Sequence, residues 1–128
     1  MDGEVIVVGG VARYLNGFSD SYEKDMVDVV TSQNGIKNLE KMGRLVKLGG
    51  TSTFPFPIIE RYGFKQGQLR LDVFVRNLED VEHKIIQGIK VSTPEHDLKF
   101  VNQMKTFYKN DFWEDKLVRL NELYDIQS

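Results

Sequence analysis

The chain contains no cysteine, and only two of its 128 residues are histidines, His83 and His96. The absence of cysteine excludes disulfide bonds, thiolate catalysis, and zinc or iron–sulfur sites with thiolate ligands. The two histidines do not have the spacing of a zinc-protease motif, so a metal site here would use carboxylate ligands and a hard cation. Because disulfide-forming residues are missing, we expect a cytoplasmic protein from a reducing compartment.

Long apolar runs and an excess of charge of one sign are also missing. No stretch approaches the ~20 apolar residues that a membrane-spanning helix needs, and the start, Met1–Glu4, is acidic where a signal peptide would be basic. The 17 lysines and arginines nearly balance the 19 aspartates and glutamates, which gives a net charge of −2. This balance excludes a protein that coats nucleic acid along its length, although it leaves room for a local basic pocket.

The composition that remains is that of an ordinary globular domain, with 41% apolar and 28% charged residues. A chain of 128 residues has the length of one domain with a single core, and no repeat or linker interrupts it. We therefore expect one α/β domain over residues 1–128. Its sheet core would cover about 1–91 and a helical pair about 92–128.

Local patterns predict the individual elements. Runs of β-branched and apolar residues predict strands at Val5–Val8, Asp25–Thr31, Leu45–Leu48, Ile58–Phe64 and Gln68–Arg76. Apolar residues at helical spacing predict a short helix over Val11–Leu15, a longer one over Ser32–Gly43, and two that begin at Ser92–Glu95 and at Asn110-Asp111. Ser32 or Asn34 is expected to cap the second helix, and Asp111 the last.

A glycine pair, Gly9-Gly10, follows the first expected strand and precedes the first expected helix. Without side chains there, backbone N–H groups can approach a phosphate, helped by the positive end of the helix. The surrounding residues match neither the G-x-G-x-x-G dinucleotide motif nor a P-loop, which needs G-K-[ST]. A glycine pair after a strand is more often only a tight turn, so both interpretations stand at this point.

Three aspartates lie within or beside apolar strands: Asp25 and Asp28 around the second strand, and Asp72 in the last one. A carboxylate flanked by β-branched residues is costly to bury unless it is paired or bound to a metal. If the three converge, they form a set of oxygen ligands suited to Mg²⁺ and to the phosphate oxygens that accompany it. Alternatively, each lies at a strand end or on a solvated face, with Asp72 paired to Arg70 or Arg76.

A charged cluster lies near the junction of the last two expected helices, formed by Lys105, Lys109, Asp111 and Asp115. Lys105 and Lys109 are four residues apart on one helix face, where they repel each other unless an anion or an acid lies nearby. Most such clusters are solvated helix faces. This one therefore has that interpretation as well as an anion-binding one.

Taken in order, these segments resemble the minimal nucleotidyltransferases of the DNA polymerase beta-like superfamily. Gly9–Gly17 resembles their GG-x-A-x-x-L-x-G pattern, Lys24–Val30 the D-x-D motif that leads into an apolar strand, and Gln68–Val75 the strand with the third carboxylate. Gly88–Leu98, followed by the lysines and aspartates above and by Leu120, is similar to a tail in one branch. That branch contains the type IV toxin (abortive-infection) nucleotidyltransferases. The resemblance implies a small mixed sheet with flanking helices and a helical C-terminal end.

The chain departs from the family at the D-x-D motif. Asp25 and Asp28 are separated by two residues instead of one, and in a regular strand this spacing sends them to opposite faces. Either a bulge at Met26-Val27 restores their convergence, or one carboxylate has been lost. If Asp25 is the first acid of the motif, Val27 stands in the second position. If Asp28 is the second acid, Met26 stands in the first.

The function that the resemblance implies is Mg²⁺-dependent transfer of a nucleoside monophosphate from a nucleoside triphosphate to an RNA, protein or small-molecule acceptor. In that role, catalysis and Mg²⁺ binding fall to Asp25, Asp28 and Asp72, and nucleotide binding falls to Gly9, Gly10, Lys24, Lys105 and Lys109. Asp72 is the candidate that helps to deprotonate the acceptor hydroxyl.

Two other functions remain open. The chain could be a catalytically degenerate member of the same fold, a binding or structural module encoded by a phage or another mobile element. A protein partner, antitoxin-like or structural, would then be expected. The chain could also be an unrelated small α/β binding domain, in which Asp72 pairs with an arginine and no cleft adjoins Gly9-Gly10.

Overall fold

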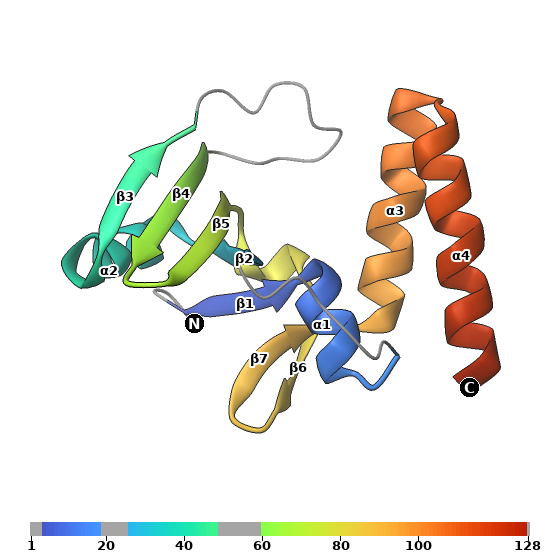
Figure 1. Cartoon of the computed structure of the whole chain (residues 1–128), viewed down its shortest axis with the longest axis horizontal. Helices are drawn as coiled ribbons and strands as arrows, with labels where there is room; N and C mark the ends of the chain where they lie inside the picture. Colours follow the sequence, from blue (N-terminus) through green and yellow to red (C-terminus); the bar gives the residue numbers. More distant parts are fainter. Residues whose placement is uncertain (1–3, 19–25, 49–59, 128) are drawn as a thin grey trace.

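The computed structural model describes residues 4–18, 26–48 and 60–127, which form one mixed sheet and four α-helices (Figure 1). Within these ranges the sheet has seven strands in the order β3-β4-β5-β2-β1-β7-β6. The strands are β1 (Val5–Val8), β2 (Val27–Thr31), β3 (Arg44–Lys47), β4 (Glu60–Gln66), β5 (Leu69–Val75), β6 (His83–Ile86) and β7 (Ile89–Ser92). The helices are α1 (Gly9–Leu15), α2 (Gln33–Met42), α3 (Pro94–Tyr108) and α4 (Asp111–Gln127), with a 3₁₀ turn η1 at Leu78–Asp80.

The centre of the sheet combines parallel and antiparallel pairs. β1 runs antiparallel to β2 and parallel to β7, while β2 runs parallel to β5. The outer pairs β3–β4, β4–β5 and β6–β7 are antiparallel. This arrangement confirms the expected α/β class with a mixed sheet and a helical C-terminal end.

The two faces of the sheet are covered by different elements. On one face, Ile36 and Leu39 of α2 pack against Val29, Val73 and neighbouring apolar residues of the sheet. Ser32 caps α2, because its side chain accepts a hydrogen bond from the Gly35 N–H at 3.2 Å, as expected.

The opposite face carries a second core and the C-terminal helices. Ile6 and Val30 pack there against Leu78 of η1 and Val81. α3 and α4 run antiparallel, side by side, at one end of the molecule (Figure 1). Their mutual core contains Val101 from α3 with Leu120 and Tyr124 from α4, and Phe18 and Trp113 pack against it.

Caps define where the two C-terminal helices begin. Thr93 accepts a hydrogen bond from the His96 N–H at 3.2 Å, and Pro94 occupies the first turn of α3, as the sequence predicts. For α4 the expectation was wrong by one residue. Asn110, not Asp111, is the cap, since its Oδ1 accepts a hydrogen bond from the Trp113 N–H at 3.2 Å.

The hairpin formed by β6 and β7 was not expected from the sequence. Its turn residues Gln87 and Gly88 both have positive φ, 52° and 79°, as tight two-residue hairpin turns require. Gln-Gly is a weaker turn signal than Asn-Gly, and the strands are only four residues long. β2 also begins later than expected, at Val27, and Asp25 and Ile58 lie outside the described residues.

Candidate functional site

A cavity of about 270 Å³ opens where the end of β1 meets α1 and the two C-terminal helices. Strands and helices from the whole length of the chain contribute to its wall. The lining residues are Val8, Gly9, Gly10, Arg13, Asp28, Val30, Phe74, Arg76, Ser92, His96, Asp97, Phe100, Met104, Trp113 and Lys116. Both residues of the glycine pair thus lie on a cavity, which favours the binding interpretation over a mere turn.

The two glycines differ in backbone conformation and in the space available for a side chain. Gly9 has φ of +69°, and a Cβ placed there would lie 2.9 Å from Oδ2 of Asp28. Only glycine fits this position without strain, because other residues rarely adopt that φ and because the carboxylate already fills the space. Gly10 is exposed, and a Cβ there would meet no atom within 4 Å. The side chain missing at Gly10 therefore leaves open space at the cavity.

α1 has only seven residues, and Val8 before it makes no side-chain capping hydrogen bond. The dipole of such a short helix contributes little attraction for an anion. Any anion held in this cavity would therefore depend mainly on charged side chains.

Asp28 and Asp72 are brought together by the sheet. They are register partners on the neighbouring parallel strands β2 and β5, so their side chains share one face. Burial raises the pKa of Asp28, and the negative charge of Asp72 raises it further. Asp28 lines the cavity, whereas Asp72 lies beside it.

The register of β2 brings Asp28 beside Asp72 of β5. The residue two positions earlier, Met26, is half exposed. Asp25 lies outside the described residues, so a bulge that brings it back to the site stays a prediction.

Asp72 forms an ion pair with Arg61, which is not one of the arginines expected from the sequence. Arg61 of β4 donates from Nε to Asp72 Oδ1 at 2.9 Å and from Nη2 to Oδ2 at 2.7 Å. The Arg61 guanidinium also lies 5.3 Å from the centre of the Phe74 ring. The expected partners were Arg70 and Arg76. Arg61 takes the place because the β4–β5 pairing sets it diagonally across from Asp72, and that register cannot be read from sequence alone.

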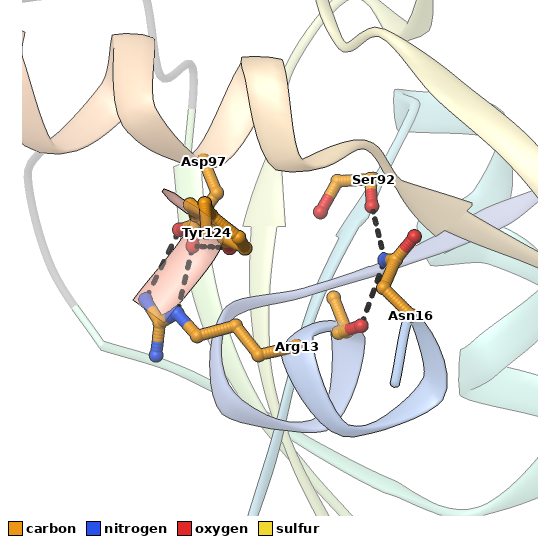
Figure 2. Close-up of polar contacts among 6 residues, drawn as sticks. Arg13, Asn16, Ser92, Asp97 and Tyr124 are labelled. Carbon is orange, nitrogen blue, oxygen red and sulfur yellow. Dashed lines mark hydrogen bonds and ion pairs between the residues drawn. The ribbon is translucent and has the colours of Figure 1, made fainter. Parts of the chain in front are cut away.

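A second ion pair ties three helices together at the cavity (Figure 2). Arg13 of α1 donates from Nε to Asp97 Oδ2 at 2.7 Å and from Nη2 to Oδ1 at 3.0 Å. Tyr124 of α4 donates its hydroxyl to the same Oδ2 at 2.5 Å. Burial raises the pKa of Tyr124, and the adjacent Asp97 carboxylate raises it further. The residues of this cluster come from three distant parts of the chain. Arg13 and Asp97 lie within the segments Gly9–Gly17 and Gly88–Leu98 that carry the family resemblance, but nothing in the sequence indicates that they pair.

Asn16 anchors the end of α1 beside this cluster (Figure 2). Its Nδ2 donates to the carbonyl oxygen of Ala12 at 2.8 Å and to that of Ser92 at 3.0 Å. The second bond joins α1 to the end of β7. The C-terminal end of α1 is therefore joined both to β7, through Asn16, and to α3, through Arg13.

The lysines of the site differ from those expected. Lys116 of α4 lines the cavity and is half-buried, while Lys105 and Lys109 do not line it. Lys109 is exposed and ends α3 in the left-handed conformation, with φ of 51°. Lys24 lies outside the described residues. The signal that could have found Lys116 is its place three residues after Trp113, on the inward-facing side of α4.

The carboxylates present fit Mg²⁺ in number. Among the residues that the structure describes, no three acids or histidines gather into a metal site. Mg²⁺ is nevertheless commonly held by one or two carboxylates together with phosphate oxygens. Asp28 and Asp72 supply two in register, and a divalent cation would offset the repulsion that raises the pKa of Asp28. Arg61 would compete for Asp72.

No protein-family model matches this chain, and no characterised protein matches its sequence. Over the described residues, none of the helices combines the length and the apolar character of a membrane-spanning segment. The chain is an α/β domain with a cavity at the end of its inner strands.

Proposed function

We propose that the chain is a nucleotidyltransferase, which binds a nucleoside triphosphate in this cavity and transfers its nucleoside monophosphate to an acceptor hydroxyl. One observation carries the proposal: Asp28 and Asp72 stand in register on parallel strands, and Asp28 lies against Gly9 of the glycine pair that borders the cavity. This is the order and the placement that the family resemblance implies for the acids and the glycines.

In this proposal each residue of the site has a separate role. Gly10 leaves space for the nucleotide, and Gly9 lets the backbone approach Asp28. Asp28 and Asp72 would hold Mg²⁺, which supplies neutralisation of the charge that develops on the reacting phosphate. Asp28 is the better placed of the two to accept the proton of the acceptor hydroxyl, because it lines the cavity while both oxygens of Asp72 accept hydrogen bonds from Arg61.

The second candidate function is nucleotide binding without transfer. The bidentate Arg61–Asp72 pair favours it, because an arginine that occupies both carboxylate oxygens opposes their use as metal ligands. If Asp28 is the second acid of the D-x-D motif, Met26 stands in the first position and favours this function too, since a thioether is a poor ligand for Mg²⁺.

Calorimetric titration of the protein with ATP and with GTP, with and without Mg²⁺, tests both candidates. A transferase should bind the nucleotide in a Mg²⁺-dependent way, and Asp28→Asn and Asp72→Asn should each weaken that binding at least about tenfold. Asp80→Asn changes an exposed aspartate outside this cavity and is the matched control. Binding that needs no Mg²⁺ and survives Asp28→Asn would favour the binding module. The absence of any nucleotide binding would contradict both candidates.

A further inference from the structure

Arg13 lines the cavity, and an ion pair fixes the position of its guanidinium. The group carries five N–H donors. The ion pair with Asp97 uses two of them, on Nε and Nη2, and the Tyr124 hydroxyl also interacts with the guanidinium. The Arg13 side chain is mostly buried, at 16% exposure, and Asp97 fixes its position (Figure 2). Donors therefore remain on a cation whose orientation is already set, which lowers the entropy lost when it binds an anion.

Lys116 enters the same cavity from the other side, on α4. In the described part of the chain, no carboxylate oxygen lies within ion-pair distance of its Nζ. The ammonium instead lies 5.4 Å from the centre of the Trp113 ring and 5.7 Å from that of Phe112. Burial lowers the pKa of Lys116, and the positive charge of Arg13 lowers it further. A half-buried cation that another cation repels is a favourable partner for an anion.

The charges on the cavity wall add up to an excess of positive charge. The cations Arg13, Arg76 and Lys116 lie on this wall with two carboxylates, Asp28 and Asp97, and the charge of Asp80, outside the cavity, acts on Arg76. Asp97 is already committed to Arg13 and Tyr124. This local excess contrasts with the net charge of −2 of the whole chain.

We propose that Arg13 and Lys116 form a two-cation site that binds the phosphate chain of the nucleotide, between α1 and α4. The identity of the ligand as a nucleotide rests on the proposed function, whereas the affinity for an oligophosphate does not. The site assigns phosphate binding to a lysine of α4 in place of Lys105 and Lys109, and it gives α4 a direct role at the cavity.

The test uses inorganic tripolyphosphate as the probe, titrated calorimetrically into the whole chain without a divalent metal. The wild type should bind it, and Lys116→Ala should weaken binding at least about tenfold, the effect of one charge-assisted hydrogen bond. Lys116→Arg should restore the affinity. Lys105→Ala, which removes a lysine outside the cavity, should bind as the wild type does.

Arg13 needs a variant that keeps the fold, because Arg13→Gln alone would strand the buried Asp97 carboxylate. The double variant Arg13→Gln/Asp97→Asn removes the pair together and should also lose at least about tenfold in affinity. Asp97→Asn alone keeps Arg13 and an amide oxygen that can accept a hydrogen bond from it, so this variant should bind the probe more tightly than the double variant does. Thermal unfolding of each variant confirms that it is folded.

Asp28→Asn separates this inference from the proposed function. It should keep tripolyphosphate binding while Mg²⁺-dependent nucleotide binding is lost. If nucleotide binding proves independent of Mg²⁺ but tripolyphosphate binding still requires Lys116, the transferase proposal fails and the two-cation site stands. If the wild type does not bind tripolyphosphate, or if Lys116→Ala binds it equally well, the two-cation site is overturned.

Discussion

Gly9 and Gly10 are neighbours in sequence with opposite tolerance for a side chain. We expect Gly9→Ala to lower the free energy of unfolding by about 2 kcal/mol, because alanine is strained at a φ of +69° and its Cβ would meet Asp28. Gly10→Ala should stay within about 1 kcal/mol of the wild type, since its Cβ meets open space in a helix. Urea denaturation of both variants measures the difference. Equal losses would contradict the assignment of Gly9 as the constrained position.

His96, on the cavity wall, makes stability depend on pH. Burial lowers its pKa below the ordinary value of 6.5, and the positive charge of Arg76 lowers it further. As pH falls, the unfolded chain therefore takes up this proton before the folded chain does. The stability that the neutral imidazole contributes is fully present above pH 6.5, and it is lost as pH falls from 6.5 through the lowered folded-state pKa.

The measurement is the free energy of unfolding in urea at pH 7.5 and at pH 5.5. The wild type should lose more stability between the two values than His96→Gln, which has no proton to gain at this position. The same loss in both proteins would show that other groups account for the pH dependence.

At the scale of elements, α4 is held to the rest of the molecule by the shared carboxylate of Asp97. Tyr124→Phe should lower the free energy of unfolding by about 2 kcal/mol, because it deletes one hydrogen bond to a charged acceptor. Asp97→Ala should lower it by about 3–5 kcal/mol, since it leaves the Arg13 guanidinium without its partner. Chemical denaturation gives both values, and a larger effect from Tyr124→Phe would contradict this ranking.

A substitution at the end of α3 is expected to raise the free energy of unfolding. Lys109 adopts the left-handed conformation with φ of 51°, which costs about 1 kcal/mol in a residue with a side chain. Lys109→Gly should therefore raise the free energy of unfolding by up to about 1 kcal/mol. Because Lys109 does not line the cavity, tripolyphosphate binding should stay unchanged. A loss of tripolyphosphate binding in this variant would show that Lys109 contributes to the phosphate site.

How far the sequence predicts this molecule depends on whether a feature is local. The alternation along β5 correctly separates Val73 and Val75, which are buried under α2, from Asp72 on the other face. The caps at Ser32 and Thr93 are likewise local, since the donor lies three residues away. Such features need only the spacing of side chains in a strand or a helix.

The features that the sequence did not reveal depend on register and on long-range packing. Arg61 reaches Asp72 only because β4 pairs with β5 in one particular register. Lys116 reaches the cavity only because α4 folds back along α3. Neither residue belongs to a motif, so only the assembled sheet and helices bring them to the site.

At the scale of the whole molecule, the inner strand β1 pairs with strands from distant parts of the chain. It lies between β2, about twenty residues away along the chain, and β7, where Val7 is the partner of Val91. The Arg13–Asp97 pair spans 84 residues in the same way. A nascent chain therefore cannot pair the second edge of β1 until β7 has emerged from the ribosome. Until then β1 exposes an unpaired edge, and this long-range pairing should make folding slower than that of a helical bundle of similar size.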